Sequence, residues 1–185
     1  YVAAIRAAQL GLTVTCVEFD QTLGGTCVNV GCIPSKALLQ SSERYEWLRL
    51  HAAEHGIKID GASVDLPTMM ARKADVVAQN TKGVEFLFKK NKITWAKGYG
   101  TLQPGNVVEV IGADGTISFW QGQSVIIATG SDPFVPPGIE TDGRTVFTSD
   151  EAVNLEWLPR WLAIIGSGYI GLEFADVYTA LGCEV

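Results

Sequence analysis

A glycine-rich loop near the C-terminal end of the chain restricts the possible folds most strongly. Residues 166–171 read Gly-Ser-Gly-Tyr-Ile-Gly, an apolar run precedes them over 161–165, and a helical pattern follows up to Leu181. A G-x-G-x-x-G loop between a strand and a helix is typical of α/β domains whose helix N-terminus binds a dinucleotide pyrophosphate. The sequence therefore predicts a Rossmann-like α/β fold, with dinucleotide contacts from Gly166, Ser167, Gly168, Tyr169, Ile170 and Gly171.

The beginning of the chain repeats the pattern of its end. Residues 9–14 (Gln-Leu-Gly-Leu-Thr-Val) resemble residues 180–185 (Ala-Leu-Gly-Cys-Glu-Val), and the same spacing would place a glycine equivalent to Gly171 immediately before Tyr1. There is no Met at position 1. We therefore expect a piece of a longer protein, lacking the first strand and glycine loop of a first nucleotide-binding domain.

Glu18 follows an expected apolar strand over residues 14–17. An acidic residue at the end of the second strand of such a domain binds the adenosine ribose. The alternative for Glu18 is a solvated side chain beside Asp20.

Two cysteines lie five residues apart in the stretch 24–36, which reads Gly-Gly-Thr-Cys-Val-Asn-Val-Gly-Cys-Ile-Pro-Ser-Lys. Proline is favoured in the first turn of a helix, so a helix is expected to begin near Ile33 or Pro34. Cys27 and Cys32 then lie in the turn that leads into this helix, where unpaired N–H groups and the helix dipole favour a thiolate.

The spacing of the two cysteines also limits what they can form. In a regular helix such residues have Cα atoms roughly 8–9 Å apart, whereas a disulfide needs less than about 7 Å. The backbone must therefore leave helical geometry between them, and Asn29 and Gly31 tolerate this best. A disulfide across so short a loop adds little stability. The spacing thus favours a redox centre, with a structural disulfide or a metal site as alternatives.

This cysteine stretch resembles the redox-active segment of the FAD-dependent pyridine nucleotide-disulfide oxidoreductases, and the resemblance extends over all 185 residues. Within the family it is most similar to the cyanobacterial and plastid members that oxidise dihydrolipoamide with NAD⁺. Relatives acting on glutathione usually carry Lys in place of Ser35, and mercuric reductases usually carry Val in place of Ile33. The resemblance implies that Cys27 exchanges disulfides with the lipoyl substrate and that Cys32 contacts the flavin.

The resemblance implies further site residues. It pairs Lys36 with Glu173 beside the flavin, so that the catalytic residues are Cys27, Cys32, Lys36 and Glu173, and Glu173 also belongs to the NAD site. The FAD contacts that it implies are Glu18, Gly24, Gly25, Thr26, Cys27, Lys36, Gly98, Gly100, Ala128, Thr129 and Gly130.

The resemblance also implies a domain division. Residues 1–158 form an FAD-binding domain without its first strand, and residues 159–185 begin an NAD-binding domain. Apolar patterns predict helices over 1–10, 37–54 and 67–92, and a buried strand over 124–128. Short β-patterns that resemble the family's small antiparallel sheet lie at 93–96, 107–111 and 116–120.

Composition excludes several classes of protein. The 185 residues are 47% hydrophobic and carry a net charge of −6. This composition indicates a globular chain and argues against nucleic acid or an anionic membrane as partner. No apolar run is long enough to span a membrane, and no targeting segment is visible. Four scattered cysteines fit a reducing compartment, such as the bacterial cytoplasm or the plastid stroma.

Residues 51–55 match the zinc motif H-x-x-E-H through His51 and His55. No third ligand is identifiable, so we expect no metal there. Cys16 and Cys183 are expected to be inert core thiols.

The partners implied by the resemblance are the lipoyl domain of a 2-oxoacid dehydrogenase or glycine cleavage complex, and a second copy in a homodimer. The alternatives are another reductase of the family, acting on glutathione or mercuric ion, and a non-catalytic nucleotide- or zinc-binding module. We expect the 185 residues alone to be inactive and to bind FAD weakly.

Overall fold

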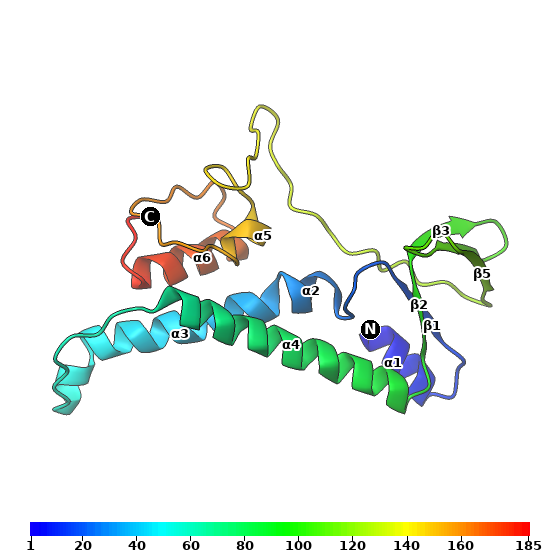
Figure 1. Cartoon of the computed structure of the whole chain (residues 1–185), viewed down its shortest axis with the longest axis horizontal. Helices are drawn as coiled ribbons and strands as arrows, with labels where there is room; N and C mark the ends of the chain where they lie inside the picture. The colour runs from blue at the N-terminus through cyan, green and yellow to red at the C-terminus, as the bar shows by residue number, and fades with distance from the viewer. The chain divides into compact units, whose positions relative to one another are not determined.

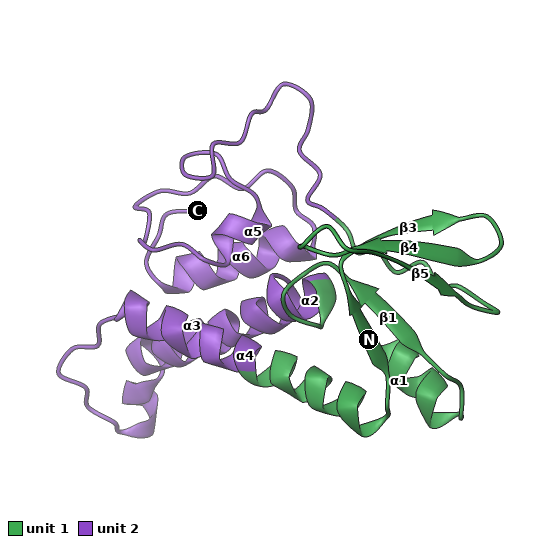
Figure 2. Ribbon diagram, turned by 45° about the vertical axis from the view of Figure 1, so that its right-hand side comes forward, with its two compact units in different colours: residues 1–25, 79–131 green, residues 26–78, 132–185 purple.

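The computed structural model describes residues 1–185, which divide into two compact units. Unit 1 comprises Tyr1–Gly25 and Gln79–Ser131, and unit 2 comprises Thr26–Ala78 and Asp132–Val185 (Figure 2). Each unit is described by itself.

Unit 1 contains a two-stranded parallel sheet and the helix that precedes it. Helix α1 spans Val2–Gln9, and strand β1 (Thr15–Glu18) pairs with β2 (Thr94–Lys97) in parallel (Figure 1). The C-terminal half of helix α4 (Leu66–Lys90) also belongs to this unit. Parallel strands are normally covered by helices, and here α1 and α4 contribute apolar side chains to a core formed by Leu23, Val84, Phe88 and Ile93.

A three-stranded antiparallel sheet completes unit 1. It is formed by β3 (Tyr99–Gln103), β4 (Val107–Ile111) and β5 (Ile117–Gln121) in that order. The sequence pattern missed β3, because two glycines surround Tyr99 and favour a loop. Pairing with β4 overrides this preference. Gly98 is required at the start of β3, since its φ is +151° and a Cβ there would lie 2.5 Å from the Ile111 carbonyl oxygen.

The prediction of a buried strand over residues 124–128 is wrong. The segment has no strand partner, and Ile126 and Ile127 are each 71% exposed. An apolar run forms a strand only where a neighbour accepts its hydrogen bonds, and β1 is paired only with β2.

Unit 2 is built on helices α3 (Cys32–Leu50) and α6 (Tyr169–Ala180). Their facing side chains share one core with the start of α4, in which Leu38 and Tyr178 are fully buried. A short helix, α2 (Gly25–Asn29), precedes α3. Helix α3 ends four residues earlier than the sequence pattern predicts, because a 3₁₀ turn, η1 (Ala52–His55), follows and Gly56 closes it with φ +75°.

Helix α5 (Ser149–Ala152) is a single turn held by contacts from other elements. Thr148 and Glu151 form a capping box at its N-terminus. At its C-terminus the Tyr178 hydroxyl donates to the Ala152 carbonyl oxygen at 2.6 Å. The Lys73 ammonium donates to the Val153 carbonyl oxygen at 2.9 Å, and burial lowers the pKa of this lysine.

The apolar run 161–165 forms much less strand than the sequence predicts. Only Trp161 makes a parallel bridge, with Glu184, and Ile165 is 79% exposed. The N–H of Leu162 donates to the Glu184 carbonyl oxygen at 2.8 Å. A single bridge leaves the other backbone groups of the run without a strand partner, so residues 161–165 do not form a second sheet.

The two cysteines outside the central stretch are thiols with little access to solvent. Cys183 is buried in the core of unit 2, and Cys16 is half-buried in β1. Burial raises the pKa of both thiols, which makes them poor nucleophiles.

None of the helices combines the length and the apolar character needed to cross a membrane.

Candidate active site

Cys27 and Cys32 lie on either side of a break between two helices, so the predicted departure from helical geometry is confirmed. The prediction that both lie in a turn is wrong, because each belongs to a helix. Cys27 is in α2, and Cys32 is the first residue of α3. Both are exposed free thiols. They are hydrogen-bonded to each other, and the backbone N–H of Cys32 also donates to the sulfur of Cys27. The pair is therefore placed where two sulfurs can exchange a bond.

Gly31 produces the break. It is the N-cap of α3, with φ −112° and ψ −116°. A Cβ at this position would lie 2.9 Å from the Thr26 carbonyl oxygen and 3.2 Å from the Cα of Cys27. Only glycine lets the turn approach α2 so closely, and this approach keeps the two cysteines together.

The electrostatic environment of Cys27 differs from the simple expectation for a helix N-terminus. Local burial raises the pKa of the Cys27 thiol although the residue is largely exposed, and the hydrogen bond to Cys32 and its negative charge act in the same direction. The backbone N–H of Cys32 and the Lys36 ammonium lower this pKa but do not outweigh the other causes. The net shift is upward, because burial and, after it, the second sulfur disfavour the thiolate.

Lys36 and Glu173 form the ion pair that the family resemblance implies, between the N-terminal parts of α3 and α6. The Lys36 side chain is 53% exposed and that of Glu173 is 21% exposed. The pair is therefore partly solvated, and we do not assign it the energy of a buried ion pair. The hydrogen bond from Lys36 to Glu173 raises the pKa of the lysine, so it stays a cation.

Sequence reasoning missed the role of Ser35. Its hydroxyl lies 3.0 Å from Oε2 of Glu173 and 3.2 Å from the carbonyl oxygen of Cys32. The residue is only 5% exposed. The sequence feature that could have identified Ser35 is its position three residues after Cys32, because residues three apart on a helix share a face.

The charge on Lys36 gives a testable pH dependence. We expect Lys36→Gln to raise the pKa of the Cys27 thiol, because the substitution removes a cation that stabilises the thiolate. At pH 8, alkylation of Cys27 by iodoacetamide in the reduced full-length protein becomes roughly three- to tenfold slower, which corresponds to about half to one pH unit.

Alkylation at Cys27 is followed by fragment-ion mass spectrometry over a range of pH. Glu173→Gln is the matched variant and should speed alkylation of Cys27, because it frees the Lys36 ammonium from its carboxylate. Equal profiles for Lys36→Gln and the unchanged protein would contradict the role given to this charge.

The loop at residues 166–171 has the geometry expected of a pyrophosphate-binding turn. A Cβ on Gly171 would lie 2.2 Å from the Gly166 carbonyl oxygen, so only glycine lets α6 begin this close to the loop. Gly166 has φ +109°, and neither it nor Gly168 has any atom within 4 Å of a Cβ position. No side chain caps the first turn of α6. Its backbone N–H groups therefore face open space that suits an anion.

In unit 1, the residues predicted to contact FAD lie in separate segments. Glu18 ends β1, and its carboxylate accepts from the N–H of Asp20 at 3.1 Å. Gly24 and Gly25 have φ of +121° and +60°. Ala128, Thr129 and Gly130 lie in exposed chain. Their binding roles stay predictions.

Gly98 and Gly100 have a reason to be glycine that needs no ligand. A Cβ on Gly100 would lie 3.0 Å from Cγ1 of Val17, and Gly98 is restricted by Ile111 as described above. Packing against Val17 of β1 accounts for Gly100, and the close approach to β4 accounts for Gly98. Their predicted contact with the adenine is therefore not needed to explain them.

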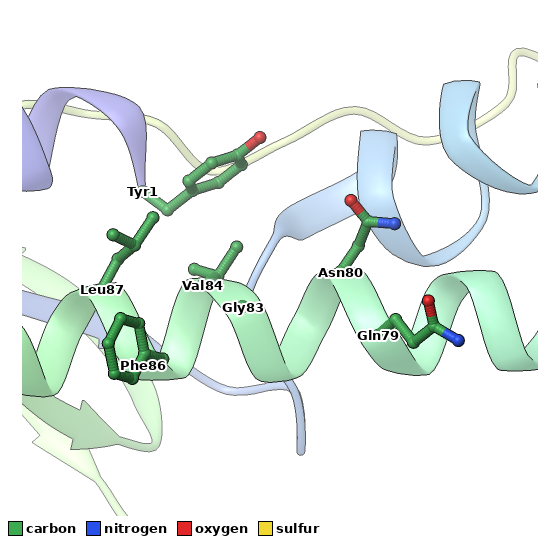
Figure 3. Close-up of a pocket in the computed structure, with 7 residues that line it drawn as sticks. All are labelled: Tyr1, Gln79, Asn80, Gly83, Val84, Phe86 and Leu87. Atoms are coloured by element: carbon green, nitrogen blue, oxygen red, sulfur yellow. The ribbon is translucent and has the colours of Figure 1, made fainter.

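Unit 1 also contains an open pocket of about 620 Å³ (Figure 3). Two amides and four apolar or glycine positions of α4 surround it together with the first residue: Tyr1, Gln79, Asn80, Gly83, Val84, Phe86 and Leu87. The lining contains no carboxylate, thiol or imidazole, and its one titratable side chain is the phenol of Tyr1.

The two histidines of the zinc motif lie at the end of α3 and in η1. Nδ1 of His51 is 3.6 Å from Glu54, and the ring of His55 packs on Trp47 with centroids 5.5 Å apart. No group of three His, Cys, Asp or Glu side chains in residues 1–185 is arranged to hold a metal ion.

Comparison with known proteins identifies the family. The model of the pyridine nucleotide-disulphide oxidoreductases matches residues 1–185. The chain belongs to this family. The family uses FAD and NAD, as the sequence resemblance implied.

Individual relatives agree with this membership. The chain is 50% identical to dihydrolipoyl dehydrogenase 1, mitochondrial, from Arabidopsis thaliana, matching all of this chain and 36% of that protein. It is also 50% identical to leghemoglobin reductase from Vigna unguiculata, again over the whole chain and 35% of that protein. The chain thus spans little more than a third of the length of these relatives.

A solved structure shares the fold of this chain. The crystal structure of LpdA from Mycobacterium tuberculosis superposes with a TM-score of 0.86 at 28% identity, covering 98% of this chain and 40% of that one. The α/β architecture predicted from the sequence is therefore confirmed.

Proposed function

We propose that the protein carrying this chain is a dihydrolipoyl dehydrogenase, which oxidises dihydrolipoamide and reduces NAD⁺ to NADH. The observation that carries the proposal is the exposed Cys27–Cys32 pair at the broken helix start, with Lys36 one turn further along α3. The 50% identity to the Arabidopsis enzyme over the whole chain supports it.

The two cysteines would perform the disulfide exchange in their oxidised form. A thiolate of dihydrolipoamide attacks the sulfur of Cys27, which breaks the Cys27–Cys32 bond and leaves Cys32 as a thiolate. The second substrate thiolate then attacks the lipoyl sulfur of the mixed disulfide. Lipoamide leaves with its own disulfide formed, Cys27 is released as a thiolate, and the protein has gained two electrons.

The charges around the pair suit this exchange. The Lys36 ammonium lies within electrostatic reach of both sulfurs and stabilises either thiolate. Both cysteines are open to solvent, which gives a large lipoyl substrate access to Cys27.

The cofactors implied by the family are FAD and NAD. When bound, FAD would supply an acceptor for the electron pair of the dithiol, and NAD⁺ would supply the final hydride acceptor. For NAD, the fit is supported by the uncapped N-terminus of α6 and the open space at Gly166 and Gly168. Gly166, Ser167, Gly168, Tyr169, Ile170 and Gly171 would hold its pyrophosphate, with Glu173 near the N-terminus of α6.

For FAD, the chain offers contacts in each unit. In unit 1, Glu18 at the end of β1 would bind the ribose, and Gly25 would be a further contact. The other proposed contacts of that unit are Gly24, Gly98, Gly100, Ala128, Thr129 and Gly130. In unit 2, Thr26, Cys27, Cys32 and Lys36 are the proposed contacts.

The finer assignments are also proposals. The division into an FAD domain over residues 1–158 and an NAD domain from 159 rests on the family resemblance, as do the cyanobacterial or plastid subtype, the homodimer and the lipoyl-domain partner. For location we propose the bacterial cytoplasm, with the plastid stroma as the eukaryotic alternative. The mitochondrial name of the Arabidopsis relative gives the plastid no support.

An assay of the full-length protein tests the proposed function. We expect a yellow protein that reduces NAD⁺ with dihydrolipoamide and develops a long-wavelength absorbance band on partial reduction. Turnover with glutathione disulfide or mercuric ion, and none with dihydrolipoamide, would replace the proposal with another reductase of the family. A colourless protein with bound zinc would reject the whole class.

A second candidate acceptor follows from the Vigna relative, which is as similar as the Arabidopsis enzyme and is named for leghemoglobin. The exposed cysteine pair does not distinguish a lipoyl group from a haem protein. NADH-dependent reduction of ferric leghemoglobin faster than NADH-dependent reduction of lipoamide would favour this second function.

A further inference from the structure

The carboxylate of Glu173 has two different donors, one for each oxygen. Oε1 pairs with the Lys36 ammonium and Oε2 lies 3.0 Å from the Ser35 hydroxyl. Both donors lie near the N-terminus of α3 and the acceptor lies near the N-terminus of α6. The two helices are therefore joined through one carboxylate.

Lys36 and Ser35 differ in how firmly they can hold the Glu173 carboxylate. Lys36 is half exposed and reaches Glu173 through a long flexible side chain, so solvent screens the attraction. Ser35 is 5% exposed and has a single side-chain torsion, fixed by the surrounding helix. A hydroxyl has one proton, and the charged Oε2 binds it more strongly than the nearby Cys32 carbonyl oxygen does. The short, buried side chain is thus the one that sets the orientation of the carboxylate.

The orientation of Glu173 matters because it determines where Lys36 points. With Oε2 occupied by Ser35, a single oxygen faces the ammonium, which stays within electrostatic reach of Cys27 and Cys32. If Oε2 is released, the carboxylate can turn both oxygens to the ammonium and draw it toward α6. The sulfurs then lose part of their positive neighbour.

We propose that Ser35 is a positioning residue: its buried hydroxyl fixes the Glu173 carboxylate and thereby keeps the Lys36 ammonium beside the cysteine pair. Ser35 touches neither substrate nor cofactor in this account. The inference rests on the proposed function only in taking Cys27 and Cys32 as the redox centre, because the contact itself is a property of α3 and α6.

A double-mutant cycle in the reduced full-length holoprotein tests the proposal. Ser35→Ala should slow alkylation of Cys27 by iodoacetamide at pH 8 roughly threefold, equal to about half a pH unit in its profile. In a Glu173→Ala background, Ser35→Ala should change the rate by less than about 1.5-fold, since the acceptor is gone. Additive effects of the two substitutions would overturn the proposal.

Ser42→Ala is the matched control, because Ser42 is a fully buried serine on the same helix whose hydroxyl donates to the Leu39 carbonyl oxygen at 3.0 Å. It should leave the alkylation profile unchanged. Ser35→Thr keeps the hydroxyl and should restore the alkylation profile. If Ser42→Ala also slows alkylation threefold, the effect comes from loosened packing and the proposal is rejected.

Alkylation requires no substrate turnover, so the inference and the proposed function fail separately. A protein without dihydrolipoamide activity that still shows the Ser35–Glu173 coupling would reject the function and keep the inference. An active dihydrolipoyl dehydrogenase without the coupling would keep the proposed function and reject the inference.

Discussion

Cys27→Ser in the full-length protein is expected to abolish dihydrolipoamide oxidation while leaving the flavin bound. The hydroxyl of serine cannot form the mixed disulfide, and loss of a nucleophile typically lowers turnover by roughly a thousandfold or more. Cys27 is exposed and lies outside both apolar cores, so the fold does not depend on it. Turnover and the flavin absorbance spectrum are measured on the same preparation.

Cys16→Ser is the control for this experiment, since Cys16 is a half-buried thiol of β1 with a raised pKa. It should keep turnover within about twofold of the unchanged protein. Turnover near normal in Cys27→Ser would remove Cys27 from the mechanism.

Gly171→Ala is expected to raise KM for NAD⁺ by roughly ten- to a hundredfold, because overpacking of this kind costs about 1–3 kcal/mol. The added methyl would lie 2.2 Å from the Gly166 carbonyl oxygen and 3.2 Å from Cγ2 of Ile164. Helix α6 must then move away from the loop, which disturbs the N–H groups proposed to hold the pyrophosphate. Reduction of the flavin by dihydrolipoamide without NAD⁺ should remain normal.

Gly83→Ala provides the comparison, because Gly83 lies in α4 and a Cβ there meets no atom within 4 Å. A methyl group at this position should leave KM for NAD⁺ unchanged and slightly stabilise the helix. An unchanged KM in Gly171→Ala as well would show that the loop does not bind the nucleotide.

Local patterns in the sequence predicted the long helices but missed the short helix α2, which contains Cys27. Helix α4, the break between the cysteines and the helix after the glycine loop all follow from proline, glycine and apolar spacing, and the structure confirms them. The Lys36–Glu173 pair is also confirmed. It came from the family resemblance, because no local pattern relates residues so far apart.

The failures have a common physical cause. The runs at 124–128 and 161–165 have the composition of buried strands, but a strand also needs a neighbour that the pattern of one segment does not contain. Strand β3 is the opposite case, because pairing with β4 makes a strand where Gly98 and Gly100 favour a loop. Ser35 was missed for a related reason, because its acceptor lies on a distant helix.

The contacts that hold α5 have a consequence for the order of folding. Four residues are too few to form a helix on their own, since nucleation costs more than one turn returns. The capping box is local, but the carbonyl groups of Ala152 and Val153 are satisfied by Tyr178 and Lys73, from α6 and α4. Helix α5 therefore acquires its structure only after these two helices have come together, and local unfolding that separates them releases it first.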